Sequence, residues 1–553
     1  MKRLLISTLA GMLTMSALTM AVPTTSAAAG VVPDLEFRAC LNDYVGQDAT
    51  DEISVVQLQV LTNSIKCSWV DISSIEGAQY LTNITEFGIW GTQISDLTPL
   101  AGLNNLSRLY LADNQISDLT PLAGLTALNE LILEDNNISS LLPLSGLTNL
   151  TYLVLHQNQI SDLSPLATLT GLTSLALSAN QITSISALAT LTGLTDLGLS
   201  NNQITSISAL ATLVNLTGLN LGGNPISDFS IISTLTGLTH LYISDTSLSS
   251  LTPLSTLTNL TNLVLDWNQI SDVTPLATLS KLEELSLNYN QIDDISAFAS
   301  LANLTQLDLA DNQITDISPL AGLPKLDSLD LQCNQITDFS PLANMTQLTG
   351  LMIGNNAFQN YGDNQITDLS ILANLTNLKS LVLSSLKISD ISGISSLTAL
   401  EQLFLYDNLI RDITPLAKLT HLYNLELENN LVSDITTLAK LTDLTIVFLD
   451  GNRISDLTPI AKLSLIDFSA ANQTMTATAI VGEKQPLPSV IGRGPLTWTV
   501  ISGDAKITGS TITYVKVGVV VLYFEDGKGF SGEVTVAVTK PPVAVLTGGT
   551  VVS

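Results

Sequence analysis

Basic residues are scarce in this chain of 553 residues. Lysine and arginine together number 20, against 49 aspartates and glutamates, and the formal net charge is −29. Nucleic-acid binding depends on phosphate neutralisation by clustered basic side chains, so the composition argues against nucleic acid as a partner. An anionic membrane surface is disfavoured for the same reason.

Cysteine is also rare, with three in the whole chain. Cys40 and Cys67 both precede the regular part of the sequence, and in an oxidising compartment we expect them to form a disulfide. Two buried thiols are the alternative. We interpret Cys333 as a neutral filler, because its repeat supplies no neighbour that would activate a thiol.

Motifs of the common enzyme chemistries are missing. The sequence contains no HExxH, GxSxG, P-loop or CxxC pattern, and its histidines, His156, His240 and His421, stand in separate segments. A shallow, open sheet also offers little of the enclosure that acid–base tuning requires. We therefore predict no enzyme activity, no metal site and no cofactor.

One long apolar run is present, from Leu4 to Val22, and no later stretch is long enough to span a bilayer. Lys2 and Arg3 precede this run and small residues follow it, as in a secretory signal peptide. We predict that the mature chain is secreted or extracellular, and that it has no transmembrane segment. A retained membrane anchor is the alternative interpretation.

The chain is built mainly from one repeated unit, of which residues 103–125, LNNLSRLYLADNQISDLTPLAGL, are an example. A pattern LxxLxLxxNxI that recurs every 20 to 29 residues is typical of leucine-rich repeats. Here a recurring asparagine marks a period of 22 residues. These asparagines are Asn114, Asn136, Asn158, Asn180, Asn202, Asn224, Asn268, Asn290, Asn312, Asn334, Asn408, Asn430 and Asn452.

Each unit changes its periodicity halfway. Leu109 and Leu111 alternate with Tyr110 and its neighbours, which predicts a short strand with one face inward. After the asparagine, apolar residues recur at every third position and a proline removes a backbone donor, which favours a tight 3₁₀ return. One coil alone buries too little apolar surface to fold, so the units must stack into a parallel sheet.

Two polar positions of the unit have predicted structural roles. The asparagines should form a ladder of hydrogen bonds to backbone groups inside the turns, with a local defect at Leu386, which cannot hydrogen-bond. A recurring aspartate should cap the 3₁₀ turn, although a row of cation sites is the alternative. These aspartates are Asp96, Asp118, Asp162, Asp272, Asp316, Asp338 and Asp456.

Segments of a different character flank the repeats. Residues 51–61, DEISVVQLQVL, predict a short helix with Thr50 as its N-cap. Near the other end, β-rich runs at 496–501, 510–515, 519–524 and 532–539 predict a small Ig-like sandwich.

These patterns divide the chain into five predicted parts: a signal peptide (1–29), an N-terminal helical cap (30–64), a leucine-rich repeat array (65–472), an Ig-like β-sandwich (473–540) and a C-terminal tail (541–553). The predicted fold class is an α/β-type solenoid. It is a leucine-rich repeat horseshoe with a parallel concave sheet and a 3₁₀ or short helical convex side, followed by a small all-β sandwich.

An insertion interrupts the spacing at residues 357–364, AFQNYGDN. It is placed between a strand and its return, and it contains Phe358 and Tyr361. Exposed aromatic residues are favoured in contacts, but a duplicated turn without a function explains the segment equally well. Both interpretations stay open.

Outward-facing strand positions line the inner surface of the predicted horseshoe. Trp and Tyr are common interface anchors, and two groups of them flank a bare stretch between Ser174 and Gly222; the alternative explanation is their preference for strands. Glu426 and Glu428 accompany the last aromatic pair. The binding candidates are Trp90, Tyr110, Glu130, Glu134, Tyr152, His156, Tyr242, Trp267, Tyr289, Phe404 and Tyr406.

The repeat NQISDLTPLAxLTxLxxLxL, the export signal, the helical cap and the module ending FSGEVTVAVT together resemble the internalin family of Gram-positive bacterial surface and secreted proteins. The resemblance implies a concave sheet that recognises a host surface protein through aromatic residues at Trp90, Tyr110 and Tyr152. We therefore expect a secreted or surface-associated, adhesion-type module that binds a protein partner. A structural or glycan-associated cell-envelope protein without a host partner is the alternative.

Overall fold

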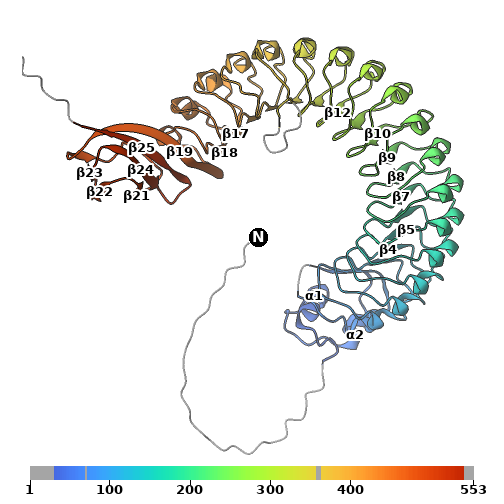
Figure 1. Cartoon of the computed structure of the whole chain (residues 1–553). Coiled ribbons are helices and arrows are strands. Elements are labelled where there is room, and N and C mark those ends of the chain that lie inside the picture. Colours follow the sequence, from blue (N-terminus) through green and yellow to red (C-terminus); the bar gives the residue numbers. More distant parts are fainter. Residues whose placement is uncertain (1–29, 69–70, 356–362, 541–553) are drawn as a thin grey trace, which may run out of the picture.

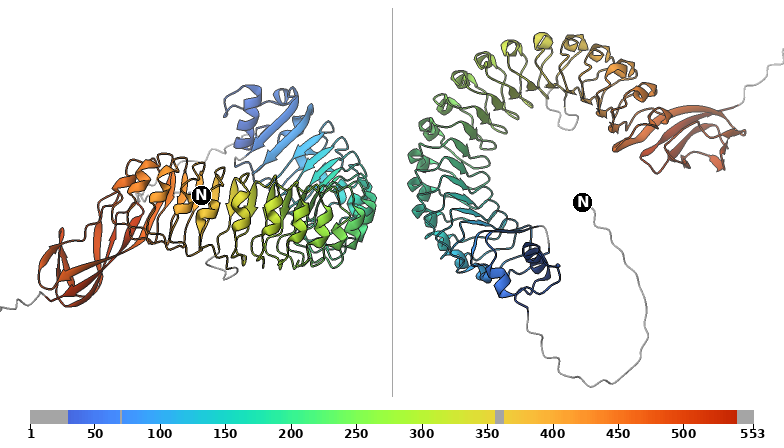
Figure 2. Two further views of the ribbon diagram at one scale, coloured as in Figure 1. Left: turned by 90° about the horizontal axis from the view of Figure 1, so that it is seen from above. Right: turned by 180° about the vertical axis from the view of Figure 1, so that it is seen from behind.

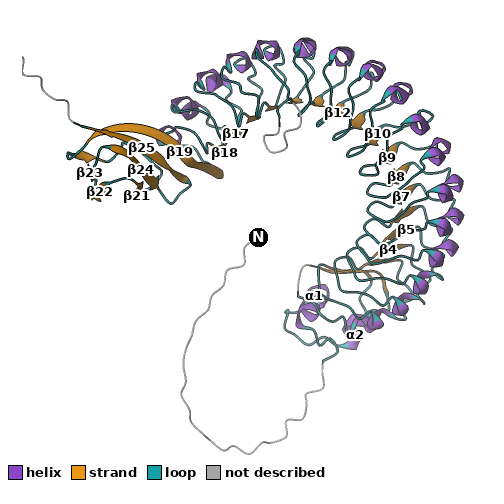
Figure 3. Cartoon of the chain, viewed as in Figure 1, coloured by secondary structure: helices purple, strands orange, loops and turns teal. Residues whose placement is uncertain are grey.

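The computed structural model describes residues 30–68, 71–355 and 363–540. They form a curved array of coils that ends in a small β-sandwich (Figure 1). Strands line the inside of the curve and short helices the outside (Figure 3). From above, the two ends of the arc lie at different levels, so the array is not planar (Figure 2). The predicted signal peptide, the tail and most of the 357–364 insertion, including Phe358 and Tyr361, lie outside the described residues.

Helix α1 (Leu35–Val45) covers the first coil. It begins at Asp34, whose carboxylate accepts hydrogen bonds from two backbone N–H groups of the first turn. Phe37 on its buried face packs edge-on against Phe87 of the array, with ring centroids 6.4 Å apart. Cys40 on the same helix forms a disulfide with Cys67. The sequence analysis did not predict this helix.

Helix α2 (Val55–Gln59) is shorter than predicted. Ser54 and Gln57 bond to each other's backbone in a capping box, which fixes the start of the helix. The prediction of a helix over residues 51–61 with Thr50 as its N-cap is therefore wrong in its bounds.

Each repeat then contributes one strand to a continuous parallel sheet. Successive strands pair in register from β1 to β19. Their bounds are β1 (Asn63–Ser68), β2 (Ile84–Trp90), β3 (Arg108–Tyr110), β4 (Glu130–Ile132), β5 (Tyr152–Val154), β6 (Ser174–Ala176), β7 (Asp196–Gly198), β8 (Gly218–Asn220), β9 (His240–Tyr242), β10 (Asn262–Val264), β11 (Glu284–Ser286), β12 (Gln306–Asp308), β13 (Ser328–Asp330), β14 (Gly350–Met352), β15 (Ser380–Val382), β16 (Gln402–Phe404), β17 (Asn424–Glu426), β18 (Ile446–Phe448) and β19 (Asp467–Ile480).

A 3₁₀ turn on the convex side completes each coil. Many of these turns have proline at their second position, where the missing N–H leaves no bond unmade. Their bounds are η1 (Ala78–Tyr80), η2 (Thr98–Leu100), η3 (Thr120–Leu122), η4 (Leu142–Leu144), η5 (Ser164–Thr168), η6 (Ser186–Thr190), η7 (Ser208–Thr212), η8 (Ser230–Thr234), η9 (Thr252–Leu254), η10 (Thr274–Thr278), η11 (Ser296–Ser300), η12 (Ser318–Gly322), η13 (Ser340–Asn344), η14 (Leu369–Leu372), η15 (Ser392–Ile394), η16 (Thr414–Lys418), η17 (Thr436–Lys440) and η18 (Thr458–Ile460).

The core is a continuous column of leucine and isoleucine side chains between the sheet and the 3₁₀ turns. Leu109 and Leu111 are fully buried, whereas Tyr110 between them is only partly covered. The same alternation recurs in the following repeats. The predicted fold class and the predicted strand register are therefore both confirmed.

The asparagines form hydrogen bonds inside the turns. The Asn136 side-chain nitrogen donates to the carbonyls of Leu111, Leu133 and Glu134 at 2.9–3.2 Å. Its oxygen accepts from the N–H of Ile116 at 2.9 Å. Each asparagine thus joins its own coil to the preceding one.

The ladder changes at two irregular positions. After the insertion, Asn364 takes the asparagine position, since its side chain accepts from Ile336 and donates to Leu331. One repeat later stands Leu386, which has no side-chain oxygen to accept from the N–H of Ile366. A hollow of about 390 Å³ lies beside Leu386 and Asn364.

The recurring aspartates lie on the surface and accept hydrogen bonds from the start of the 3₁₀ turns that follow them. Asp118 accepts from the N–H of Thr120 and Asp162 from that of Ser164, each at 2.8 Å. The hydroxyl bond from Thr120, followed by the N–H bond, lowers the pKa of Asp118 below its ordinary value.

Strand β19 belongs to both parts of the chain. Its first residues pair with β18, and from Ala470 onward, with a register shift before Gln473, it pairs in parallel with β25 (Phe530–Thr539). It therefore runs through the predicted boundary between residues 472 and 473. Gln473 also closes the ladder, because its side-chain oxygen accepts from Ile454 and its nitrogen donates to Leu449.

The remaining strands form the sandwich. β25 pairs antiparallel with β24 (Gly518–Glu525), which pairs with β21 (Thr497–Ser502). In a second sheet, β23 (Thr511–Tyr514) lies between β20 (Lys484–Pro486) and β22 (Ala505–Thr508). Phe524 packs against Trp498 and Phe530, with ring centroids 5.4 and 5.1 Å away. These antiparallel strands agree with the predicted Ig-like region.

Candidate binding surface

Three side chains of each repeat project from the concave sheet. They lie on either side of the two buried leucines, so in the repeat of β3 they are Arg108, Tyr110 and Ala112. Because the strands are in register, each of these positions forms a column across the sheet at a spacing of about 4.8 Å. The concave surface is thus a grid of side chains, three from each repeat, and the types of side chain in it change from one end of the sheet to the other.

At the N-terminal end, the grid carries paired charges. Glu86 forms ion pairs with Lys66 and with Arg108, the latter at 3.2 Å. The hydrogen bond from Lys66 lowers the pKa of Glu86 and raises that of Lys66. Lys66 Nζ also lies 5.1 Å from the centroid of the Tyr110 ring.

The first two predicted aromatic candidates lie in this network. Trp90 ends β2, and its ring lies over Gly88, where an added Cβ would be 2.8 Å from the ring. Both Trp90 and Tyr110 are half-buried. Burial, followed by the neighbouring Glu130, raises the pKa of Tyr110. Trp90, Tyr110 and Glu130 therefore lie together on one surface.

The next candidates form a second group. His156 Nε2 lies 2.9 Å from the carboxylate of Glu134, one repeat earlier. Tyr152, the first residue of β5, is 41% exposed. These three predicted residues all face the concave side.

Small side chains expose the backbone in the centre of the sheet. Strands β6 to β9 carry residues such as Ala176, Gly198 and Gly218, which leave a hollow of about 390 Å³ bordered by His240 and Tyr242. Tyr242 is the only predicted binding candidate at this hollow. The bare stretch seen in the sequence is thus a depression between two groups of larger side chains.

Two predicted residues do not lie at strand positions. Trp267 and Tyr289 follow the strands, immediately before the ladder asparagines, in left-handed backbone conformations with φ of 57° and 56°. The prediction that they belong to the outward-facing strand register is wrong by one residue, because the chain has already turned there. Their rings stack at the edge of the sheet, and Trp267 is 56% exposed.

Strands β10 to β13 add acidic side chains that the sequence analysis missed. Asp266, Asp308 and Asp330 face the concave side, and burial raises the pKa of all three, that of Asp330 to about 6. Within the described ranges, no basic side chain forms an ion pair with them. They occupy the same columns as Tyr110 and Glu134, so the register could have identified them.

The last group of candidates lies on β16 to β18. Phe404 ends β16, Tyr406 follows two residues later, and both are half-buried on the concave side. Glu426 of β17 lies between Phe404 and Phe448 of β18, because these residues are partners in the strand register. The sequence analysis missed Phe448, although it lies two repeats after Phe404.

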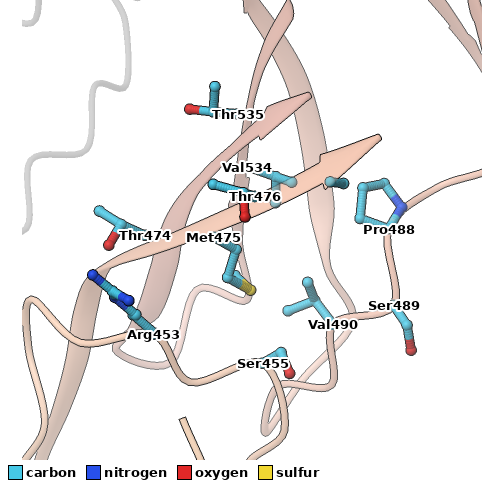
Figure 4. A pocket seen from close by; sticks show the side chains of 11 residues that line it. Arg453, Ser455, Thr474, Met475, Thr476, Pro488, Ser489, Val490, Val534 and Thr535 are labelled. Atoms are coloured by element: carbon cyan, nitrogen blue, oxygen red, sulfur yellow. The ribbon is translucent and has the colours of Figure 1, made fainter. Parts of the chain in front are cut away.

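Another hollow lies away from this grid. It measures about 610 Å³ and lies between Arg453 of the last repeat, residues 474–477 of β19 and residues 488–490 of the sandwich (Figure 4). Arg453 is the one ionisable residue in its lining, so the lining holds no acid–base pair. We therefore assign the candidate function to the concave sheet.

The comparisons with known proteins agree with this architecture. The family model for leucine-rich repeats in two copies matches residues 82–124, 126–168, 148–190, 170–212, 192–234, 258–303, 280–322, 302–344, 376–418 and 398–440. These segments together cover more than half of the chain. The chain therefore belongs to the leucine-rich repeat family.

Among solved structures, the chain is 30% identical to an internalin, InlF, of Listeria monocytogenes, over 81% of this chain and 100% of that one, with a TM-score of 0.32. It is 34% identical to internalin C2 of the same species, over 38% of this chain and 94% of that one, with a TM-score of 0.37. The sequence identities mark the repeats as internalin-like.

A leucine-rich repeat protein of Leptospira interrogans shares the fold, with a TM-score of 0.54 at 23% identity, over 70% of this chain and 95% of that one. No curated protein matches the chain. Over the described ranges, the structure also contains no helix with the length and apolarity needed to cross a membrane.

Proposed function

We propose that the chain is a secreted or surface-associated module of the adhesion type, which recognises a protein partner with its concave sheet. The observation that carries this proposal is the N-terminal surface, where Trp90, Tyr110 and Tyr152 project from the grid beside fixed charges. The hydrophobic core does not require aromatic side chains at these positions, whereas protein interfaces are enriched in them.

The charges support the same interpretation. Lys66, Glu86 and Arg108 hold one another in place around Tyr110, so little side-chain freedom remains to be lost when a partner binds. A rigid surface of aromatic and charged groups is better suited to a folded protein as its binding partner than to a small metabolite. The open hollow on β6 to β9 leaves room for a protruding segment of such a partner.

Binding to intact cells tests the proposal. We would label the purified chain and a Trp90→Ser, Tyr110→Ser variant, and measure binding to mammalian and bacterial cells by flow cytometry. Leu142→Ser is the matched control, because Leu142 lies in η4 on the convex side and is 68% exposed. We expect the control to bind like the unmodified chain, and the double variant to lose binding while keeping its thermal unfolding temperature.

Treatment of the cells separates the two candidate functions. A protein partner predicts that protease treatment of the cells abolishes binding and that glycosidase treatment leaves it intact. Equal binding by the double variant, or loss of binding only after glycosidase treatment, would favour the structural or glycan-associated envelope protein instead.

A further inference from the structure

The C-terminal part of the concave sheet places a carboxylate between two aromatic side chains. Phe404, Glu426 and Phe448 are register partners on β16, β17 and β18. Two strand spacings separate the phenylalanine backbones, which is about 9–10 Å. Glu426 therefore lies between two aromatic side chains on the same face of the sheet.

The next row of the grid carries two further acids. Glu428 and Asp450 follow Glu426 and Phe448 by two residues, and Tyr406, two residues after the end of β16, occupies the same position of its repeat. Asp450 accepts hydrogen bonds from the hydroxyl of Ser469 at 2.6 Å and the N–H of Ala471 at 2.7 Å. Among the residues that the structure describes, none in a neighbouring repeat donates such a hydrogen bond to the Glu428 side chain.

Two acceptor atoms in this group have no hydrogen-bond partner among the described residues. One is Oε2 of Glu428 and the other is Oδ1 of Asn424. The Asn424 side chain is buried, with 8% exposed, and it donates to Glu426 on the same strand. Both acceptors are buried in the free chain, so an external hydrogen-bond donor reaches them only when the side chains that cover them move aside, and it then satisfies a group that is otherwise unpaired.

No basic residue of the described chain neutralises these acids. Glu426, Glu428 and Asp450 form none of the ion pairs that the structure contains. Burial, followed by the like charges of Glu426, Asp450 and Asp407, raises the pKa of Glu428 to about 7. A positive charge bound beside these carboxylates would therefore lower the electrostatic energy of the group.

The other end of the sheet shows the contrast. There Glu86 has Lys66 and Arg108 as partners, and its pKa is lowered by the hydrogen bond from Lys66. The same fold thus supplies internal cations on β1 and β3 but none on β16 to β18. The described residues also contain no group of three or more ligands that could hold a metal ion, so the missing charge is better supplied by an organic cation.

We propose that the concave surface of β16 to β18 binds an arginine side chain of a polypeptide partner; this inference rests on the proposed protein-binding function and names the chemistry of one contact. The guanidinium is planar and carries five donors, so it can approach the flanking phenylalanine side chains while donating to several acceptors. Those acceptors are Glu426, Glu428 and Asn424. Lysine, a point charge with three donors, meets fewer of these requirements.

A short peptide tests the site on the intact chain. We would measure fluorescence anisotropy with a labelled Gly-Arg-Gly-Arg-Gly amide in 150 mM salt, and with the same peptide carrying citrulline in place of arginine. Citrulline keeps the size of arginine and removes its charge. We expect saturable binding of the arginine peptide and none of the citrulline peptide.

Two double variants distinguish a local site from the general negative field. The pairs Glu426→Gln with Glu428→Gln and Asp308→Asn with Asp330→Asn each replace two carboxylates by amides on the same sheet, and each pair includes one acid whose pKa burial raises to about 6 or 7. We expect the first pair to weaken arginine-peptide binding by about tenfold or more, and the second by less than about twofold. Phe404→Leu with Phe448→Leu should weaken it by about threefold to tenfold through lost cation–π contact.

The assignment would be overturned by no saturable binding up to millimolar protein, by equal binding of the citrulline peptide, by equal loss in the two acid variants, or by a lysine peptide that binds as tightly as the arginine peptide. Spermidine displacing the arginine peptide at an equal concentration would also contradict it. Because these variants leave Trp90 and Tyr110 unchanged, a negative result here leaves the cell-binding proposal intact. A negative cell-binding result likewise leaves the arginine site standing.

Discussion

The ring of Trp267 stacks on the ring of Tyr289, with centroids 3.7 Å apart and planes inclined by 11°. Both residues occupy the last position before a ladder asparagine, where the backbone is left-handed. In most other repeats this position is Asp, Asn or Gly, which adopt that conformation more readily. The stack therefore offsets an unfavourable backbone conformation.

This relationship predicts how substitutions at Trp267 behave. Trp267→Asn removes a stack that contributes about 0.5–1.5 kcal/mol, but it introduces a residue suited to positive φ. We expect its free energy of unfolding to change by less than about 1 kcal/mol. Trp267→Val loses the stack and keeps the strain, so it should destabilise the chain by about 2 kcal/mol or more. Urea unfolding of both variants measures the difference, and equal effects would contradict this account.

The asparagine ladder predicts a large effect from a small side chain. Asn136→Ala removes four hydrogen bonds and leaves the N–H of Ile116 without an acceptor. The three carbonyls keep their other donors, which belong to Asn114, Asp113 and Asn158. The unpaired N–H costs about 1–3 kcal/mol and each further lost hydrogen bond about 0.5–1.5 kcal/mol, partly offset by relaxation, so we expect a loss of at least about 2 kcal/mol. Asn137→Ala, at the exposed neighbouring position, should change stability by less than about 0.5 kcal/mol. If both variants unfold at the same urea concentration, the ladder is not stabilising.

Reduction of the disulfide between Cys40 and Cys67 should destabilise only the N-terminal part of the chain. The disulfide joins α1 to β1 across 27 residues, and loss of such a link costs about 2–4 kcal/mol. In a repeat array each coil contacts only its neighbours. After reduction, hydrogen exchange should therefore accelerate in residues 35–68 and stay unchanged in β9 to β12. Acceleration throughout the array would show that the cap controls the whole fold.

The raised pKa of Glu428 predicts a defined pH dependence. Its folded-state pKa of about 7 lies above the ordinary value of 4.5, so the folded chain binds this proton more tightly than the unfolded chain does. The stabilisation is fully present below about pH 4.5 and is lost as the pH rises through about 7. Glu428→Gln removes this loss, so we expect the variant to gain stability relative to the unmodified chain between pH 5 and pH 8.

The control for this experiment is Asp118→Asn. Hydrogen bonds from Thr120 lower the pKa of Asp118, so its contribution is lost only as the pH falls below the ordinary value of 3.8. Between pH 5 and pH 8 it is charged in both the folded and the unfolded states. The urea midpoint difference between this variant and the unmodified chain should therefore stay constant over that range, while that of Glu428→Gln changes.

The repeat array could be predicted well from the sequence because the same pattern of leucines and asparagines recurs in unit after unit. The alternation at Leu109 and Leu111 and the spacing of the asparagines each recur in many units, so one error does not shift the register. The prediction nevertheless placed Trp267 and Tyr289 wrongly at outward-facing strand positions. Their aromatic character favours a strand, but the strand ends before them and the chain turns.

Other features depend on spatial neighbours that a sequence pattern does not contain. Gln473 replaces the ladder asparagine in a repeat that is one residue shorter, and its longer side chain reaches the same groups. The unpaired oxygens of Asn424 and Glu428 depend on which side chains the adjacent strands bring near. The predicted binding residues are therefore placed by the structure, while their use by a partner remains a prediction.

Strand β19 gives the sandwich a mechanical role. A force applied at Lys540 would enter β25 and pass along its parallel bonds to β19, loading them in shear, so that many break together. The load would then reach Asp467–Ser469, the few residues of β19 that join β18. Under tension the last coil should peel away before the sandwich opens, which would make the junction near Gln473 the point of mechanical failure.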